Sequence, residues 1–246
     1  MSGAHQFALY YVHLDTILGG KKQGNTFQLQ DSEIIKRIVH VLRLVESESV
    51  LLFNKQTQWV VTIESIEKKH ITCTITSITQ AKEINPHITF LLPLLKRDSL
   101  EQAVYNLVEL GVNTIQLVAT QKTQNKLNGQ KELERLERIC ISACEQSKQF
   151  NVPTIIAPIP FAQAMNLKHT TLCLYADPEG EKLSMIIPHI EGNRKPIMLM
   201  VGPEGDLTSD EKALLKNNNF IFCALTPTVL RSWQAASLLT GIVRSL

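Results

Sequence analysis

The sequence predicts an α/β fold in two parts: a small N-terminal β-barrel, and a larger C-terminal domain whose parallel sheet is covered by helices. Runs rich in β-branched residues fill the stretch from Val50 to Ile78, whereas strand-like and helical patterns alternate from His87 onward. Near the C-terminus, the apolar run Ile197–Val201 leads into a glycine turn and a helix start. Such an arrangement is common at small-molecule sites in α/β proteins.

The N-terminal part has three strand-like runs joined by polar breaks. The breaks Asn54–Gln58 and Glu67–His70 suit hairpin turns, and the sequence therefore predicts a β-barrel over roughly residues 1–80. A polar linker, Gln80–Pro86, ends at a natural breaker, so the second domain is expected to occupy residues 87–246. The predicted strands of the barrel are Val50–Phe53, Trp59–Ile63 and Ile71–Ile75.

The C-terminal part alternates between five short apolar runs and helical patterns. One helical stripe runs from Leu100 to Leu110 and another from Leu133 to Ala143. This alternation predicts a parallel sheet covered by helices. The predicted strands are Ile88–Leu92, Thr114–Ala119, Leu172–Ala176, Ile197–Val201 and Ile221–Leu225.

A glycine turn follows the fourth of these strands. Gly202 and Gly205 permit a tight turn and let a ligand approach the bare backbone, and Thr208–Glu211 has the spacing of a capping box. A plain strand-to-helix turn explains the same residues equally well. After the next strand, Thr226–Thr228 forms a turn, and Ser232 is expected to cap a final helix.

Composition narrows the class of protein. Among 246 residues, 44% are hydrophobic and the formal net charge is +2, which is typical of a soluble globular protein and permits RNA binding without requiring it. Without a bilayer-spanning run or a signal peptide, we expect a cytoplasmic protein that does not enter a membrane. The five scattered cysteines suit a reducing compartment. Cys140 and Cys144 can share a helix face, but no neighbouring His or Cys completes a metal site.

Two C-terminal motifs resemble a known family. The turn Gly202-Pro203-Glu204-Gly205, followed by a strand and then Leu230-Arg231-Ser232, is similar to the C-terminal signature of the SPOUT methyltransferases. Within that class it most resembles the family that methylates N3 of a uridine in 16S ribosomal RNA. Matching segments lie upstream in the same order and extend the resemblance over nearly the whole chain: Val41–Arg43, Val108–Val112 and Ala143–Ser147.

The resemblance implies a fold, a cofactor and partners. It implies a PUA-like RNA-binding module at the N-terminus and a deep trefoil knot in the C-terminal sheet, with the last helix threaded through the preceding loop. It also implies a homodimer, a 16S rRNA substrate within the small ribosomal subunit, and S-adenosylmethionine bound mainly against backbone in the knot loops. The residues expected at the cofactor are Leu174, Met200, Val201, Gly202, Pro203, Glu204, Gly205, Leu225 and Leu230.

Some of these positions have simpler interpretations. Core packing explains Met200, Val201 and Leu225 as well as cofactor contact does. Helix capping is the alternative for Glu204. Arg231 is the catalytic candidate, because a fixed cation at a helix entrance orients a phosphate or stabilises a uridine that loses its N3 proton. A surface arginine paired with a carboxylate is the alternative.

Basic residues elsewhere are candidates for RNA contact. Lys36, His40 and Arg43 are spaced at i, i+4 and i+7, so an α-helix would place them on one face with Ile35, Ile38 and Leu42 behind them. A solvated helix face is the alternative. Further candidates near predicted strand ends are Lys96 and Lys122.

The chain departs from the family pattern at three notable positions. Asp206 stands where a second glycine is common, Trp233 replaces an acidic residue, and Lys148 replaces the glycine after the Glu-Gln-Ser motif. These changes suggest an alternative function, namely an RNA-binding or ribosome-assembly protein that kept the fold and lost the chemistry. A weaker alternative, based on the glycine turn alone, is a different nucleotide-binding α/β enzyme.

Overall fold

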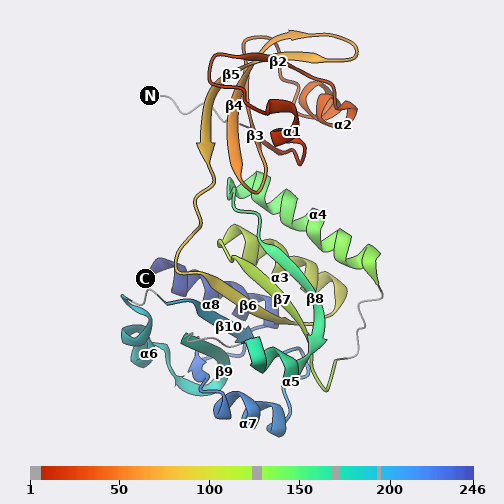
Figure 1. Ribbon diagram of the computed structural model, residues 1–246. Coiled ribbons are helices and arrows are strands. Elements are labelled where there is room, and N and C mark those ends of the chain that lie inside the picture. The colour runs from red at the N-terminus through yellow and green to blue at the C-terminus, as the bar shows by residue number, and fades with distance from the viewer. Residues whose placement is uncertain (1–6, 124–128, 168–171, 193–194) are drawn as a thin grey trace. The chain divides into compact units, whose positions relative to one another are not determined.

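The computed structural model describes residues 7–123, 129–167, 172–192 and 195–246 (Figure 1). The chain forms two compact units. The first contains the residues up to Lys82 together with Cys144–Val152, and the second contains Glu83–Ala143 and Pro153–Leu246. The division predicted at residues 80–87 leaves Cys144–Val152 with the second domain, whereas in the structure this segment belongs to the first unit.

The first unit contains a five-stranded sheet with the order β1-β3-β4-β5-β2. The strand β1 pairs in parallel with β3, and the other pairings are antiparallel. The hairpin turns predicted from the polar breaks are confirmed. The short strands β1 and β2 at the two edges escaped prediction. The strands are β1 (Phe7–Tyr10), β2 (Thr26–Leu29), β3 (Ser49–Phe53), β4 (Thr57–Ile66) and β5 (Ile71–Gln80).

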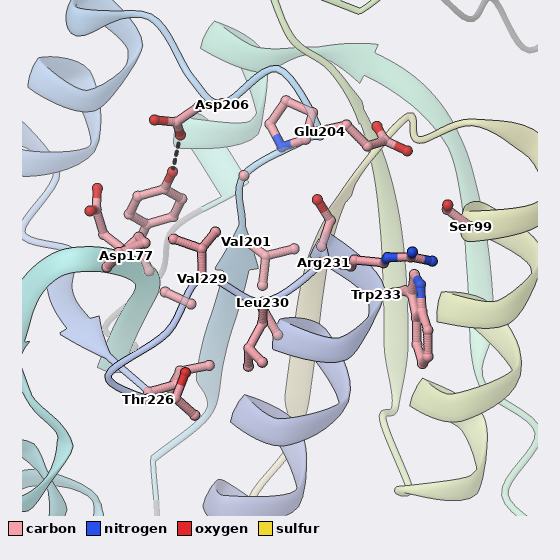
Figure 2. A pocket seen from close by; sticks show the side chains of 18 of the residues that line it. Ser99, Asp177, Val201, Glu204, Asp206, Thr226, Val229, Leu230, Arg231 and Trp233 are labelled. Carbon is pink, nitrogen blue, oxygen red and sulfur yellow. Dashed lines mark hydrogen bonds between the residues drawn. The ribbon is translucent and has the colours of Figure 1, made fainter.

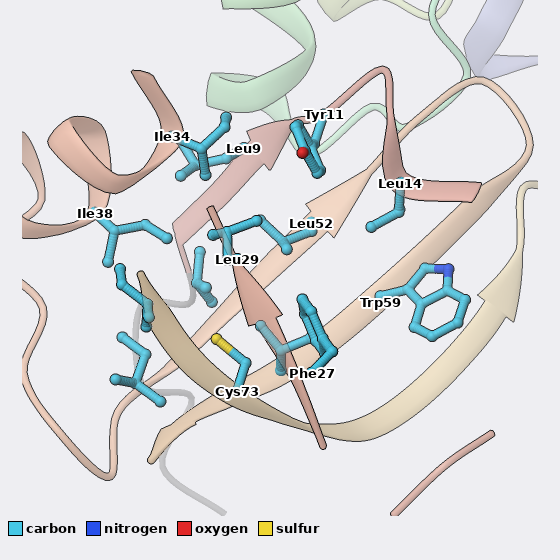
Figure 3. Packing of buried hydrophobic residues seen from close by; sticks show 14 of the residues in the cluster. Leu9, Tyr11, Leu14, Phe27, Leu29, Ile34, Ile38, Leu52, Trp59 and Cys73 are labelled. Carbon is cyan, nitrogen blue, oxygen red and sulfur yellow. The ribbon is translucent and has the colours of Figure 1, made fainter. Parts of the chain in front are cut away.

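Alternation of apolar and polar residues curves this sheet around one core. Along β4 the residues Trp59, Val61 and Ile63 are buried, and along β5 the residues Ile71 and Cys73 face them. Figure 3 shows how side chains from the edge strands and from the helix α2 close over the same cluster. The helical pieces of this unit are α1 (Leu14–Leu18), α2 (Ser32–Lys36) and the π-helix η1 (Arg37–Val41).

The expected single α-helix carrying Lys36, His40 and Arg43 is wrong. After Lys36 the chain widens into the π-helix, in which the Leu42 amide donates to the Arg37 carbonyl at 2.9 Å. The helix then ends, and Arg43 has a φ of 56°. The wider turn keeps Ile38 fully buried, but it removes the i, i+4, i+7 register on which one shared face depended. The three basic side chains are all exposed.

The Glu-Gln-Ser motif has a structural role in the first unit. The Glu145 carboxylate accepts a hydrogen bond from the Tyr10 amide at 2.8 Å and pairs with both terminal nitrogens of Arg37 at 2.9 and 2.6 Å. The hydrogen bond to Glu145 raises the pKa of Arg37. Lys148 has a φ of 58°, a left-handed conformation that glycine adopts without strain, which suits the glycine that the family resemblance led us to expect there.

The second unit is a six-stranded parallel sheet with the order β11-β9-β10-β6-β7-β8, as the alternation predicted. The strand β8, which contains two prolines, lies at an edge and escaped prediction. The strand β9 extends past its predicted end at Ala176. The strands are β6 (Ile88–Pro93), β7 (Thr114–Ala119), β8 (Thr154–Pro160), β9 (Leu172–Lys182), β10 (Ile197–Val201) and β11 (Ile221–Ala224).

Helices cover both faces of this sheet (Figure 1). On one face α3 and α8 pack against each other, and α5 and α7 pack together on the other. Met198 and Met200 of β10 contribute to the core cluster that also contains Phe161 of α5 and Leu215 of α7. The helices are α3 (Arg97–Glu109), α4 (Gln130–Ser147), α5 (Phe161–Ala164), η2 (Met165–Leu167), α6 (Leu183–Ile190), α7 (Ser209–Asn217) and α8 (Ser232–Ser245).

At Gly180 the backbones of β9 and β11 approach each other closely. A Cβ atom there would lie 2.5 Å from the carbonyl carbon of Phe222, at the point where the register between β9 and β11 shifts.

At the start of α8, Arg231 and not Ser232 is the N-cap residue, so the predicted cap is displaced by one position. Arg231 therefore has extended backbone at the helix entrance.

The C-terminal helix is attached to the sheet by Arg244. Its guanidinium donates to the Pro86 carbonyl at 2.7 Å, the Gly111 carbonyl at 2.5 Å and Asn113 Oδ1 at 2.7 Å. Asn113 Oδ1 also accepts from the Ile88 amide at 2.9 Å. Burial lowers the pKa of Arg244 to about 10, so the neutral oxygen atoms must stabilise a partly desolvated charge.

We expect Arg244→Met to reduce the free energy of unfolding by about 2–4 kcal/mol, because three oxygen atoms lose a charged donor at once. Arg135→Met is the matched control, since the Arg135 guanidinium is solvent-exposed and pairs with Glu101 at the surface. Chemical denaturation of both variants measures the difference. Equal stability of the two variants would contradict this role of Arg244.

Candidate functional site

A cavity of about 590 Å³ lies at the carboxyl ends of β10 and β11, beside the middle of β9. The starts of α3 and α8 complete its wall. Its size lies within the range of small-molecule sites. The lining residues are Lys96, Ser99, Tyr175, Ala176, Asp177, Pro178, Val201, Gly202, Pro203, Glu204, Asp206, Cys223, Leu225, Thr226, Thr228, Val229, Leu230, Arg231, Ser232, Trp233 and Ala235.

The glycine turn is held in place by the helix that follows it. The predicted capping box is confirmed: the Glu211 amide donates to Thr208 Oγ1 at 3.3 Å, and the Thr208 amide donates to Glu211 Oε2 at 2.9 Å. The second carboxylate oxygen of Glu211 accepts from the Gln121 amide at 2.7 Å. These bonds fix the path of the chain from β10 into α7.

Gly202 leaves the space that a ligand would need beside the end of β10. A Cβ atom at this position would lie 3.0 Å from the Tyr175 hydroxyl and 3.1 Å from Asp206 Oδ1. Any side chain would therefore press on that hydrogen-bonded pair and project into the lining. Glycine leaves the backbone bare at this position of the lining.

One side of the cavity carries a hydrogen-bonded acidic network. The Tyr175 hydroxyl donates to Asp206 Oδ1 at 3.2 Å, the bond drawn as a dashed line in Figure 2. Lys212 Nζ lies 2.8 Å from Asp206 Oδ2 and 2.9 Å from Asp177 Oδ2. Asp206 has a φ of 55°, a left-handed conformation that glycine adopts without strain, which suits the glycine that the family resemblance led us to expect there. Its carboxylate also accepts from the Leu207 amide at 2.7 Å.

These contacts set the protonation states in the network. Burial acts to raise the pKa of Asp206, but the hydrogen bonds from Lys212 and the Leu207 amide outweigh it and hold that pKa below its usual range. Burial, followed by the nearby Asp206 charge, raises the pKa of the Tyr175 phenol. At neutral pH the network therefore contains ionised Asp206 and protonated Tyr175.

Arg231, Trp233 and Glu204 lie on the other side of the cavity. Figure 2 shows Arg231 and Trp233 extending toward Ser99, away from Asp177 and Asp206. The Arg231 guanidinium is exposed, and within the described residues it has no ion pair. The alternative interpretation of Arg231, a surface pair with a carboxylate, thus has no support in the described part of the chain.

Glu204 connects the glycine turn to α3. Its Oε1 accepts a hydrogen bond from the amide of Lys96, the N-cap residue of α3, at 3.1 Å. Glu204 therefore supports a helix start, as the capping alternative proposed, although that helix lies far away in the sequence. At the end of the turn, Lys122 Nζ donates to the Gly205 carbonyl at 2.8 Å.

Most of the residues expected at the cofactor lie around the cavity, and three do not line it. Leu174 and Met200 are fully buried in the core, and Gly205 lies outside the lining. Core packing is thus the observed environment of Met200. Among the basic candidates, Lys96 lines the cavity and Lys122 does not. The expected residues that do line it are Val201, Gly202, Pro203, Glu204, Leu225, Leu230 and Arg231.

Sequence reasoning missed the acidic network and Ser99. The polar residue Asp177 directly follows the apolar part of β9, which is a signal for a side chain at the carboxyl edge of a parallel sheet. Tyr175 carried no such signal, because it lies within the apolar run. Ser99 comes from α3, and only the packing of α3 against α8 brings it to the cavity.

The lining suits the S-adenosylmethionine that the family resemblance implies. Val201, Leu225 and Leu230 supply apolar surface for a flat base, and the bare backbone at Gly202 leaves amide and carbonyl groups accessible. The carboxylates of Asp177 and Asp206 offer acceptors for a positively charged ligand group. The chemistry of the lining therefore matches a cationic nucleoside.

The described residues form neither a metal-binding cluster nor a membrane-spanning helix. No group of three or more His, Cys, Asp or Glu residues is placed to hold a metal ion there. Burial raises the pKa of the thiols of Cys73, Cys144 and Cys223 to about 12, which disfavours the thiolate that a metal needs. None of the described helices has the length and apolarity to cross a bilayer.

Exposed Lys36 and Arg43 in the first unit remain candidates for phosphate contact, although they do not share a helix face. We expect the double variant Lys36→Ala/Arg43→Ala to flatten the salt dependence of RNA affinity by about two phosphate contacts. Affinity for S-adenosylmethionine should stay unchanged. Filter binding over a salt series is the measurement, and an unaltered slope would leave these side chains as ordinary solvated residues.

The chain is similar in sequence and in structure to known proteins. Solved structures include a ribosomal RNA small subunit methyltransferase E from Neisseria gonorrhoeae bound to S-adenosyl methionine, which is 26% identical, covers 98% of both chains and has a TM-score of 0.83. Curated relatives with the name ribosomal RNA small subunit methyltransferase E include one from Rickettsia conorii, 28% identical over 91% of both chains. Another, from Bacillus subtilis, is 24% identical over 87% of this chain and 88% of its own.

Two family models match the two parts of the chain. The model for an RNA methyltransferase PUA domain matches residues 30–76, and the model for an RNA methyltransferase domain matches residues 82–244. The second match includes the glycine turn, the acidic network and Arg231. Because it covers more than half of the sequence, this chain belongs to the RNA methyltransferase domain family.

Proposed function

We propose that this protein transfers a methyl group from S-adenosylmethionine to N3 of a specific uridine in 16S rRNA of the small ribosomal subunit. The observation that carries the proposal is the cavity at the glycine turn, in a chain of the RNA methyltransferase family, with an arginine at its edge that has no ion pair among the described residues. The similarity to the Neisseria gonorrhoeae methyltransferase bound to S-adenosyl methionine supports the choice of cofactor. The names of the relatives support the choice of ribosomal RNA.

The residues of the cavity have distinct proposed roles. Gly202, Leu225 and Leu230 hold the nucleoside of the cofactor, which supplies an electrophilic methyl group on a positively charged sulfur atom. Arg231 stabilises the negative charge that develops on the uracil as its N3 proton leaves. Because the methyl donor is already activated, alignment of the two reactants supplies much of the acceleration.

The departures from the family pattern do not favour a protein without catalytic activity. Asp206 occupies a left-handed position at a cost of about 1–2 kcal/mol, but its carboxylate gains bonds to Tyr175, Leu207 and Lys212. The backbone thus keeps the shape that glycine gives in relatives. Lys148 is a similar case in the first unit, with a φ of 58°. Neither change fills the cavity.

We infer a trefoil knot from the path of the chain through the second unit. The strand β11 pairs with β9 on the side away from β10, and the chain then returns in α8 to pack against α3, β10 and β9. Residues 175–178 within β9 and residues that follow β10 and β11 line the cavity, which suits knot loops that hold the cofactor. The family resemblance supports the threading of α8 through the preceding loop.

We also propose that the protein acts in the cytoplasm as a homodimer that assembles through the second unit. Exposed apolar side chains near α8 support this, among them Val229 (80% exposed) and Leu238 (37%). Sedimentation at low micromolar concentration should give twice the chain mass of 27.6 kDa. A single species of monomer mass at that concentration would contradict the dimer.

A combined binding and transfer assay tests the proposed function against its alternatives. Calorimetry with S-adenosylmethionine, followed by incubation with undermodified small subunits and labelled cofactor, should show both binding and label in 16S rRNA. RNA binding without cofactor binding would favour the assembly protein. Cofactor binding without transfer to ribosomal RNA would favour a different enzyme of the same fold.

A further inference from the structure

Trp233 lies on the same side of the cavity as Arg231, at a position where the family pattern has an acidic residue. It lies in the first turn of α8, lines the cavity with Arg231 and Ser99, and is partly buried (Figure 2). Ser237 supports it by donating from Oγ to the Trp233 carbonyl at 2.8 Å. Asn106 of α3 in turn donates to Ser237 Oγ at 2.9 Å, so this turn of α8 is fixed to α3.

The indole is the aromatic surface that the cavity offers to a ligand. Tyr175 is the other aromatic side chain in the lining, but it is 1% exposed and its ring packs edge-on against Phe222 at a centroid distance of 4.9 Å. Its hydroxyl is bonded to Asp206. In contrast, the Trp233 indole N–H has no hydrogen-bond partner within the described ranges and keeps access to solvent.

The charges of the cavity indicate which reactant meets the indole. Asp177 and Asp206 lie on one side and suit the cationic cofactor, whereas the cation Arg231 lies on the side of Trp233, where the Glu204 carboxylate is bonded to the Lys96 amide. A uracil that loses its N3 proton becomes anionic and requires the cationic side. Single-stranded bases in RNA sites stack on aromatic rings, and this stacking tolerates any base because every base has a π-face.

We propose that Trp233 is the stacking platform for the target base and so determines how the RNA substrate, rather than the cofactor, is held beside Arg231. This inference rests on the proposed methyl transfer to RNA. The indole N–H supplies a donor for a carbonyl oxygen of the uracil or for a phosphate. Replacement of an acidic residue by Trp also removes a negative charge from the place where the anionic base would lie.

The first test compares Trp233→Leu with Trp233→Phe in steady-state methylation of undermodified small subunits. Leu keeps apolar volume and removes the aromatic face, so the KM for subunits should rise roughly 5- to 150-fold, the equivalent of one lost base stack. The kcat should change less, because stacking acts in both the bound and the transition state. Phe should stay close to the wild type, and the affinity of both variants for S-adenosylmethionine should not change.

The second test measures the fluorescence of the Trp233 indole. Trp59 and Trp233 are the two tryptophans of the chain, and Trp59 is buried in the first unit, so a Trp59→Phe variant leaves Trp233 as the single emitter. Addition of protein-free 16S rRNA should quench its fluorescence in proportion to the RNA retained in a parallel filter-binding assay. Addition of S-adenosylmethionine alone should change the emission much less.

The outcomes separate this inference from the proposed function. Active wild type with equal KM values for Trp233→Leu and Trp233→Phe would overturn the stacking role alone, and so would RNA retention with unchanged emission. A loss of cofactor affinity in Trp233→Leu would show that the ring only supports α8, which also overturns it. Wild-type protein that neither retains RNA nor transfers methyl groups would contradict the proposed function itself.

Discussion

Replacement of Arg231 by Ala is expected to slow methyl transfer by about 10²–10³-fold, the usual consequence of losing one preorganised electrostatic partner. The guanidinium lines the cavity, is exposed and has no ion pair among the described residues, so its charge is available to the substrate. Affinity for S-adenosylmethionine should change little, because the nucleoside is expected to rest on Gly202 and on apolar side chains. Single-turnover methylation at saturating cofactor measures the chemical step.

Arg231→Lys distinguishes the shape of the guanidinium from its charge. A lysine supplies a point charge but not the planar fork, so rescue should be poor. Arg97→Ala is the matched control, since Arg97 begins α3 outside the lining and pairs with Glu101 at the surface. Transfer at the wild-type rate by Arg231→Ala would show that the catalytic side of the cavity is assigned incorrectly.

Gly202→Val is expected to abolish binding of S-adenosylmethionine at concentrations that saturate the wild type. The Cβ atom alone would lie 3.0 Å from the Tyr175 hydroxyl, and the two further methyl groups would enter the space around the backbone that a ligand needs. Gly202→Ala should show a smaller loss, because Tyr175 and Asp206 can move by a few tenths of an ångström. Calorimetry measures both affinities.

Gly241→Ala is the matched control for this series. Gly241 lies within α8, and a Cβ atom there meets Leu110 Cδ2 at 3.8 Å, which is ordinary van der Waals contact. The substitution should stabilise the helix by about 0.5–1 kcal/mol and leave cofactor affinity unchanged. Undiminished cofactor binding by folded Gly202→Val would move the site away from the glycine turn.

The central elements of both sheets were predictable because their residues carry a regular pattern. Apolar and polar residues alternate along β4, and β10 is a continuous apolar run, so each strand shows its burial in the sequence. The strands that escaped prediction, β1, β2 and β8, are sheet edges. Two of them have four residues and the third contains prolines, so their apolar and polar residues form no repeat from which a strand can be recognised.

Predictions based on the spacing of residues along a helix were wrong where the backbone is not a regular α-helix. The pattern Lys36, His40, Arg43 assumes 3.6 residues per turn, and the π-helix changes that period without any signal in the apolar positions. Pairings between distant segments were also invisible. The bond from Arg37 to Glu145 and the pairing of Lys212 with both Asp177 and Asp206 depend on the folded path of the chain.

The glycine turn of the candidate site could be predicted from the sequence, whereas most of the other residues that line the cavity could not. Gly202 and the capping box of Thr208 and Glu211 were visible as a motif; in the structure Gly202 lines the cavity, and the capping box forms at the start of α7. The left-handed backbone at Asp206 explains why a departure from glycine leaves the turn intact. A sequence motif records which residue is usual at a position, whereas the dihedral angle shows what the position requires.

We propose above all that the cavity aligns S-adenosylmethionine with the N3 atom of a ribosomal uridine. The most direct measurement incubates the purified protein with undermodified small subunits and labelled cofactor, digests the 16S rRNA and identifies the modified nucleoside by mass spectrometry. Primer extension then locates it, because a methyl group on N3 blocks Watson–Crick pairing and stops the polymerase. We expect 3-methyluridine at one position, only with cofactor present. Label in another base or at another atom, or no label in rRNA from a protein that binds the cofactor, would contradict it.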